Sequence, residues 1–273
     1  MLVEWAIFMD TRFIESPAPK TKPHFMNSAP LPATWKWHVA RDYEAGSAIA
    51  AERLLSAWRM NPGLLVCTAT GNSPTRTYQL FAQSILSEGV RATNLRLLKL
   101  DEWGGLSPDD PATCEVYLQE QLVKPLLISQ DRFIGFQSDA SPPENECQRV
   151  SAWLEMNGPI DVCVLGLGIN GHLGFNEPGA ALTADCHVAK LTSDSLSHGM
   201  LSTTSNRPSH GLTVGMRGIL ASRTILLLVF GNAKAEQLKR LATGGLSTDF
   251  PASFLTLHQH VVCVCDKAAA GRL

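Results

Sequence analysis

The chain has 273 residues, a formal net charge of −2, 45% hydrophobic residues and 18% charged residues, which is the balance of an ordinary globular protein with a sizeable core. Its 23 Lys and Arg residues are scattered along the chain, so we expect no nucleic-acid partner. No apolar run reaches the roughly 20 residues of a membrane helix, so we expect no membrane partner.

The first 38 residues differ from the rest of the chain. They hold five prolines and little hydrophobic periodicity, which predicts an irregular N-terminal extension over residues 1–38, ahead of a single α/β domain over residues 39–273. The amino terminus carries neither a basic segment nor a long apolar core, so we expect no signal peptide and a cytoplasmic location. The seven cysteines have no paired metal-ligand spacing, which favours reduced thiols and no metal site.

Helical and strand-like hydrophobic spacing then alternate along the domain. Helices are predicted around 48–58, from Pro74, near 113–122, near 144–153 and from Asn232. Short apolar runs predict buried strands at 64–67, 95–100, 161–165, 224–230 and 261–265. Strands that alternate with helices pair in parallel, so we expect an α/β fold with a doubly wound, mostly parallel, Rossmann-like sheet and helices on both faces. Ligands of such sheets bind beyond the carboxyl ends of the strands.

The first candidate segment follows the strand at 64–67. It contains Thr70, Gly71, Asn72 and Ser73, and small residues of this kind leave backbone N–H groups open. Pro74 suits the first turn of the next helix, whose positive end attracts anions. The segment is either a phosphate-binding loop or an ordinary turn capped by Ser73, and by itself it favours neither.

The second candidate segment places two acids, Asp101 and Glu102, after the next predicted strand. Folding does not require adjacent acids there. Neighbouring residues of an extended chain point to opposite faces, so one acid can reach a site while the other serves structure. A surface turn is the alternative, and this segment alone favours it.

The third candidate segment, residues 165–179, is the most informative. It contains glycines at 166, 168 and 171 with the spacing of a dinucleotide-binding loop. That function requires a helix to open at the third glycine, and further glycines and a proline at 174, 178 and 179 would break such a helix. We therefore expect an irregular loop in which glycines allow close approach to a ligand and which presents His172 and Glu177.

The fourth candidate segment places Lys234 in the first turn of a predicted helix, directly after the strand at 224–230. A positive charge at that end of a helix is unfavourable for the helix dipole. A bound anion would compensate, and a solvated surface lysine is the alternative.

At these four segments the sequence resembles the glucosamine-6-phosphate deaminase family, most closely its galactosamine-6-phosphate deaminase/isomerase branch, with the 6-phosphogluconolactonases as a sister family. The resemblance runs from about residue 40 to residue 267 and also includes residues 211–215 and 251–258. It implies an enzyme of amino sugar catabolism that converts galactosamine 6-phosphate or glucosamine 6-phosphate, a small-molecule sugar phosphate, to a ketose 6-phosphate and ammonia. It implies no cofactor. The oligomeric state stays open, with a homo-oligomer among the alternatives.

The resemblance also implies a role for each candidate residue. Asp101 would be the base that moves a proton between C2 and C1 of the sugar. His172 would open the pyranose ring, with Glu177 holding its orientation. The loop from Thr70 to Ser73 and Lys234 would hold the 6-phosphate. A carboxylate and an imidazole suit such proton transfers, and a lysine with backbone N–H groups suits a phosphate.

Two departures from the family pattern stand out. The better-known deaminases have Asp where this chain has Asn170, and we expect Asn170 to orient His172 by hydrogen bonding without carrying charge. The family's phosphate-binding arginine lies in a lid segment, which here falls near residues 183–211 and lacks it. Arg207 or His198 would substitute. Alanines 180 and 181 replace serines of the allosteric site, so we do not expect that regulation.

Three other functions remain as alternatives. A 6-phosphogluconolactonase-type hydrolase would share the glycines and His172, but those enzymes lack the run Phe175-Asn176-Glu177-Pro178, which is typical of deaminases. A non-catalytic sugar-phosphate sensor is compatible with Asn170 but not favoured by the retained Asp101 and His172. A nicotinamide-dependent dehydrogenase is the most distant alternative.

Overall fold

The computed structural model describes residues 35–273, so residues 1–34 of the predicted N-terminal extension lie outside the described residues. The predicted boundary at residue 38 falls inside a strand, β1 (Lys36–Ala40), which pairs in parallel with the last strand of the chain. This strand is half exposed at the edge of the sheet. It therefore lacks the continuous apolar run from which the other strands were predicted.

The central sheet has seven parallel strands in the order β1-β10-β9-β6-β2-β3-β5, which confirms the predicted fold class. Its inner strands are buried on both faces, as their apolar sequences require. The strands after β1 are β2 (Leu65–Thr68), β3 (Arg96–Lys99), β5 (Phe133–Ile134), β6 (Val162–Gly166), β9 (Thr224–Val229) and β10 (Val261–Asp266).

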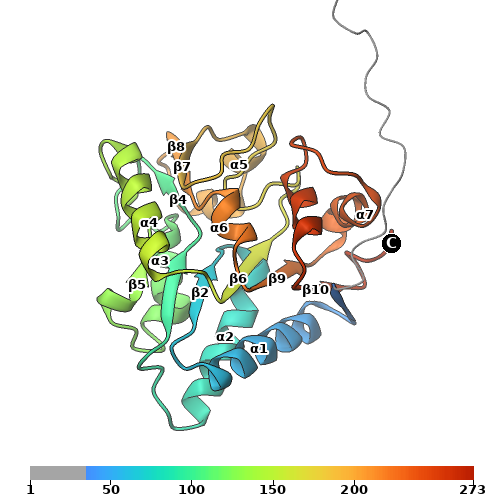
Figure 1. The fold of residues 1–273 in the computed structure, drawn as a ribbon, viewed down its shortest axis with the longest axis horizontal. Helices are drawn as coiled ribbons and strands as arrows, with labels where there is room; N and C mark the ends of the chain where they lie inside the picture. Colours follow the sequence, from blue (N-terminus) through green and yellow to red (C-terminus); the bar gives the residue numbers. More distant parts are fainter. Residues whose placement is uncertain (1–34) are drawn as a thin grey trace, which may run out of the picture.

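Helices cover both faces of this sheet (Figure 1). One face packs against α1 (Tyr43–Met60), α2 (Asn72–Ser87) and the helix formed by α3 (Cys114–Leu118) and the π-helix η1 (Gln119–Val123). The other packs against α4 (Pro143–Asn157), α6 (Met216–Leu220), α7 (Ala235–Thr243) and the 3₁₀ helix η5 (Pro251–Leu257). The helix predicted from Asn232 begins as a 3₁₀ turn, η4 (Asn232–Lys234). Within residues 35–273, no helix combines the length and apolarity needed to cross a bilayer.

A second sheet was not predicted. It is antiparallel, in the order β4-β8-β7, and consists of β4 (Asp101–Gly104), β8 (His210–Thr213) and β7 (His187–Ala189). The segment after Leu100, expected as a loop, is therefore a strand. Its polar sequence does not indicate a strand, because the side chains that bury it come from distant parts of the chain. The ring centroid of Trp103, for example, lies 4.6 Å from that of Phe175.

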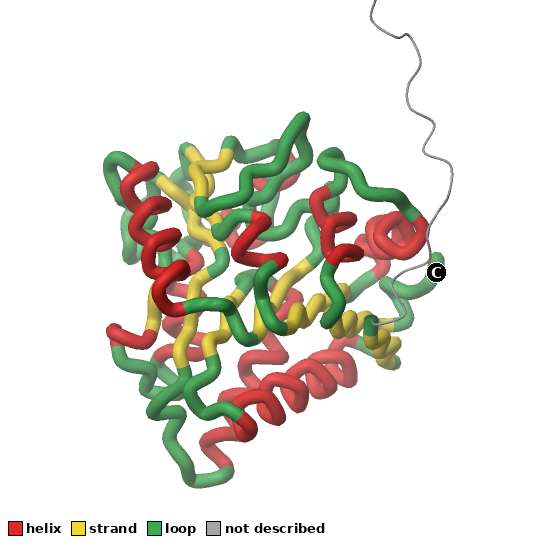
Figure 2. Tube along the Cα trace, viewed as in Figure 1, coloured by secondary structure: helices red, strands yellow, loops and turns green. Residues whose placement is uncertain are grey.

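The predicted lid segment, residues 183–211, is mostly loop and leads from the loop after β6 into the start of β8 (Figure 2). It contains β7, the short helix α5 (Ser193–Leu196) and the 3₁₀ helix η3 (Gly199–Thr203). The remaining short element is the 3₁₀ helix η2 (Gln130–Arg132) ahead of β5. The backbone of Ala184 and Asp185 in the lid segment packs closely against Gly215 before α6: a Cβ at Gly215 would lie 2.0 Å from the carbonyl oxygen of Asp185 and 2.4 Å from that of Ala184.

Candidate active site

A cavity of about 320 Å³ opens at the carboxyl ends of the central strands, where a doubly wound sheet places its ligands. Segments that are far apart in the sequence meet there: the loop after β2, the start of β4, the loop after β6, the lid segment and the turn after β9. Six of the predicted site residues line it, together with others that the sequence did not single out. The predicted six are Thr70, Asn72, Ser73, Asp101, His172 and, from η4, Lys234.

The loop after β2 presents an uncapped helix end to this cavity. Gly71 has a φ of +93° and precedes α2, whose first turn has neither a side-chain cap nor an acidic residue. Two carbonyl oxygens of the turn are engaged by tyrosines: Tyr117 Oη donates to Gly71 O at 3.1 Å and Tyr43 Oη donates to Asn72 O at 2.7 Å. Ser73 does not cap this helix, and the uncapped N–H groups at its start are of the kind that suits an anionic ligand.

Lys234 lines the same cavity from the 3₁₀ turn after β9. Burial lowers the pKa of its ammonium group. In the part of the chain that the structure describes, Lys234 forms no ion pair with a carboxylate. A half-buried cation beside open N–H groups suits an anionic ligand.

Asp101 is the first residue of β4 and lines the cavity. The pKa of its carboxyl is raised to about 7: burial contributes most and the charge of Glu102 adds to it, while Lys99 and the hydrogen bond of Cys114 act in the opposite direction. A carboxylate with a pKa near neutrality is a stronger base than an ordinary aspartate and still ionises under neutral conditions. The thiol of Cys114, which also lines the cavity, lies 3.9 Å from Oδ1 of Asp101.

Glu102, the second acid of the pair, points away from the cavity and is fully buried. Its carboxylate accepts hydrogen bonds from the backbone N–H groups of Trp103 and Cys114, both at 2.8 Å, and of Glu115 at 2.9 Å. Lys99 donates to the same carboxylate at 2.6 Å and to that of Glu115 at 2.9 Å. Glu102 therefore joins β4 to the start of α3 and holds Asp101 between them.

The loop after β6 presents His172 with an acid behind it. Nδ1 of His172 lies 3.4 Å from Oε2 of Glu177. Burial alone would raise the pKa of Glu177, but the interactions of His172, Ser195 and Asn170 lower it to about 2, so Glu177 is a carboxylate at neutral pH. Ser195, which donates to the other oxygen of Glu177, comes from α5 in the lid segment. The sequence did not predict this contact between lid and loop.

Asn170 hydrogen-bonds to the backbone of His172 and to the acid behind its ring. Its side-chain amide donates to Oε2 of Glu177 at 3.0 Å, while its Oδ1 accepts the backbone N–H of His172 at 3.0 Å. Neither contact involves the imidazole ring. Asn170 therefore shapes the loop and orients Glu177, and it affects the ring of His172 only through that carboxylate.

The glycines of this loop serve close packing, not a dinucleotide. A Cβ at Gly168 would lie 2.4 Å from Cδ2 of His172, and one at Gly171, whose φ is +88°, would lie 2.0 Å from the ring of Phe250. No helix opens at Gly171 within the described chain: a turn with an isolated bridge between Leu173 and Asn176 follows. The dinucleotide-binding alternative is excluded by this geometry.

Arg207 is not brought to the site. It is exposed and does not line the cavity. The other residue proposed for this role, His198, does line it. Residues of the cavity wall to which sequence reasoning gave no role include Cys114 and Trp103, which carry no motif of their own.

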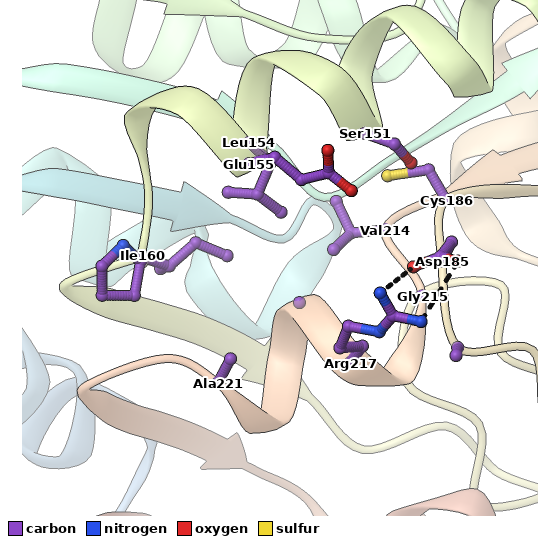
Figure 3. Close-up of a pocket in the computed structure, with 13 residues that line it drawn as sticks. Ser151, Leu154, Glu155, Ile160, Asp185, Cys186, Val214, Gly215, Arg217 and Ala221 are labelled. Carbon is purple, nitrogen blue, oxygen red and sulfur yellow. Dashed lines mark hydrogen bonds and ion pairs between the residues drawn. The ribbon is translucent and has the colours of Figure 1, made fainter.

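A second hollow, of about 170 Å³, lies between α4 and α6 (Figure 3). Its wall is mostly apolar, and Arg217 pairs with Asp185 at its edge, with Nη1 3.2 Å from Oδ1. None of the predicted site residues lies there. The acid–base groups and the anion-binding end are all in the first cavity, which is the candidate active site.

Fold and cavity define a doubly wound α/β protein with acid–base residues at the carboxyl ends of its strands. The chain belongs to the family described as glucosamine-6-phosphate isomerases/6-phosphogluconolactonase, whose model matches residues 43–264. The predicted family is thereby confirmed.

Two proteins to which the chain is similar are named as deaminases. The chain is 41% identical over 223 residues to "Putative deaminase AgaI" of Escherichia coli (strain K12), covering 82% of this chain and 88% of that protein. It is 34% identical over 231 residues to glucosamine-6-phosphate deaminase 1 of Bacillus subtilis (strain 168), covering 84% and 96%.

Solved structures give the same order of similarity. A structure titled as a monomeric glucosamine-6-phosphate deaminase superposes with a TM-score of 0.83 at 33% identity, covering 87% of this chain and all of that one. The 6-phosphogluconolactonase of Trypanosoma brucei superposes with a TM-score of 0.73 at 18% identity, covering 87% of this chain and 98% of that one. The second likeness shows a shared fold alone.

Proposed function

We propose that this protein is an amino sugar 6-phosphate deaminase/isomerase, which converts galactosamine 6-phosphate or glucosamine 6-phosphate to the ketose 6-phosphate and ammonia. The observation that carries the proposal is that one cavity holds two separate acid–base groups, Asp101 and His172, together with an anion-binding end. The names of the deaminase relatives support it. We also propose that the protein is cytoplasmic.

Ring opening is the proposed task of His172. The ring oxygen must gain a proton while the anomeric hydroxyl loses one, and an imidazole can do both near neutral pH. The Glu177 carboxylate beside Nδ1 stabilises the imidazolium and holds the ring in place, so that Nε2 is the nitrogen that exchanges protons with the sugar.

Proton transfer between C2 and C1 is the proposed task of Asp101. The open-chain sugar has an acidified C2–H next to its aldehyde, and a carboxylate can take this proton and return it at C1. Return of the proton at C1 leaves an imine at C2. Water adds to this imine to give a carbinolamine, whose C–N bond breaks to release ammonia and leave the ketose. A pKa of about 7 matches a group that must both accept and return the proton.

Binding of the 6-phosphate is the proposed task of the loop from Thr70 to Ser73 and of Lys234. The N–H groups at the start of α2 supply dipoles and the ammonium group supplies charge. Both are remote from the reacting carbons, so they fix the position of the sugar without taking part in proton transfer.

The test is product formation by the purified full-length chain. Galactosamine 6-phosphate and glucosamine 6-phosphate are each supplied, and ammonia and ketose phosphate are measured in equal amounts. Hydrolysis of 6-phosphogluconolactone is measured in parallel. Equimolar ammonia and ketose from either amino sugar supports the proposal. Lactone hydrolysis without ammonia release would instead identify a hydrolase, and binding of both amino sugars without turnover would identify a sensor.

A further inference from the structure

His198 stands where the lid segment meets the anion-binding loop. It is the residue before η3, and it lines the cavity. A Cβ at Gly71 would lie 3.2 Å from both Cε1 and Nε2 of its imidazole, so this edge of the ring faces the loop. The ring centroid lies 6.0 Å from that of Trp103, which also lines the cavity.

The tautomer of His198 follows from its other nitrogen. The backbone N–H of Met200 donates to Nδ1 at 3.3 Å, so Nδ1 acts as an acceptor in the neutral ring. The proton of neutral His198 therefore sits on Nε2. Local backbone contacts thus hold a donor toward the loop at Gly71, and protonation of the ring keeps that donor and adds a charge.

Positive charge in the cavity is scarce. Among the described residues that line it, Lys234 is the one Lys or Arg side chain. A phosphate dianion on the loop would carry more negative charge than a single ammonium group neutralises. A second cation at the mouth of the cavity would therefore strengthen binding.

We propose that His198 is a second ligand of the substrate phosphate, donating from Nε2, and that binding of the phosphate draws a proton onto its imidazole. The position of the phosphate rests on the proposed function. The side chain remains accessible to solvent, so it can exchange protons as the anion arrives.

The electrostatic surroundings give the sign of the effect. Loss of hydration lowers the pKa of His198, and the charges of His172 and Lys234 lower it further. An anion on the loop opposes the effect of these cations and raises the pKa. Anion affinity is therefore highest below the pKa of the empty site, and it falls as pH rises until the pKa of the occupied site is passed.

Two acids face the same cavity, Asp194 from α5 and Asp101 from β4. Asp101, with a pKa of about 7, gains charge in the same pH range and would also weaken anion binding. The experiment therefore compares Asp101→Asn with Asp101→Asn/His198→Gln, so that Asp101 does not titrate in either protein. His172 is present in both.

Sulfate is the probe, because it remains a dianion throughout the range in which histidine titrates. Its dissociation constant is obtained at several pH values from the sulfate dependence of the unfolding temperature. In Asp101→Asn the constant should rise about tenfold or more with pH, the scale of a charge-assisted hydrogen bond. In Asp101→Asn/His198→Gln it should stay near the high-pH value. The control His187→Gln alters a histidine outside the cavity, which bonds to Asp185 O, and should retain the full pH dependence.

Equal pH dependence with and without His198, or no sulfate binding to Asp101→Asn at any pH, overturns the proposal. In the otherwise unaltered protein, His198→Gln should raise KM for the amino sugar phosphate and leave kcat within about twofold, because phosphate contacts are uniform binding. If neither amino sugar is deaminated while sulfate binding still depends on His198, the proposed function fails and the ligand assignment stands.

Discussion

Asn170 donates a hydrogen bond of 3.0 Å to Oε2 of Glu177, the same oxygen that lies 3.4 Å from Nδ1 of His172. The amide and the imidazole therefore share one carboxylate oxygen. Ser195 from the lid segment donates to the other oxygen. These contacts outweigh burial and lower the pKa of Glu177 to about 2. Glu177 therefore stays charged around neutral pH and can hold the ring of His172 in one orientation.

Replacing Asn170 with Asp tests this arrangement. The variant would set a second carboxylate against Glu177 and remove the amide donor, so the two acids would share a proton and their pKa values would rise. We expect kcat/KM at neutral pH to fall about tenfold or more and the acidic limb of its pH profile to move upward. The control is Asn157→Asp, at the end of α4, whose side-chain amide donates to Trp153 O, away from the cavity. Superimposable profiles for Asn170→Asp and the unaltered protein would contradict the shared-oxygen arrangement.

Asp101→Asn should abolish turnover, because an amide cannot accept the C2 proton. With Asp101 present, kcat/KM should rise with pH and level off above about 7, as the carboxyl with a pKa of about 7 ionises. The measurement is ammonia release across pH, together with sulfate binding to show that the anion loop is intact. Near-normal kcat in the variant would remove Asp101 from the role of base.

The same substitution should stabilise the fold at high pH. The pKa of Asp101 is 3.8 in an unfolded chain and about 7 in the folded protein, so the folded state holds this proton to higher pH. The folded protein therefore loses stability as pH rises from 3.8 to about 7. Asp101→Asn removes this loss, and we expect the free energy of unfolding above that range to increase by about 1–2 kcal/mol. Urea unfolding at high and low pH measures it, and the difference between the two proteins should vanish near pH 4.

Lys99→Met tests the ion pairs behind Asp101. Lys99 is almost fully buried between Glu102 and Glu115, and its loss leaves buried carboxylates without a cation. Removing one partner of a buried ion pair costs about 3–5 kcal/mol, so we expect urea unfolding to show a free energy of unfolding lower by that amount. Since the charge of Lys99 lowers the pKa of Asp101, the rise of kcat/KM should also move to higher pH. Lys239→Met, on the exposed side of α7, is the matched control. A stable variant with an unmoved profile would show that Lys99 does not influence Asp101.

Lys234→Ala should weaken binding more than it slows chemistry. In the proposed site the ammonium group binds the phosphate and not the reacting carbons, so its loss should raise KM by the equivalent of about 1.5–3 kcal/mol and change kcat little. Steady-state kinetics over a range of amino sugar phosphate concentrations, up to saturation, measures KM and kcat separately. An unchanged KM would return Lys234 to the alternative of a solvated lysine.

The central sheet could be predicted because each of its inner strands has its own apolar run. Residues 161–165 and 224–230 must be buried on both faces, and this requirement is written locally. Because the carboxyl ends of parallel strands lie at one edge of the sheet, the sequence also predicted that Asp101, His172 and Lys234 lie near one another. The antiparallel sheet escaped prediction because β4 carries two acids, and its burial depends on Phe175 and on a strand more than 100 residues later.

Roles within the site were decided by contacts between distant segments. The sequence alone determined that one acid of the pair at 101 and 102 could be structural, but only the arrival of α3 made Glu102 that residue and left Asp101 in the cavity. Likewise, the lid segment brought Ser195 to Glu177 and His198 to Gly71, while it left Arg207 in solvent. Side-chain type and strand order are encoded locally, whereas burial, pKa and hydrogen-bond partners depend on which surfaces the folded chain brings together.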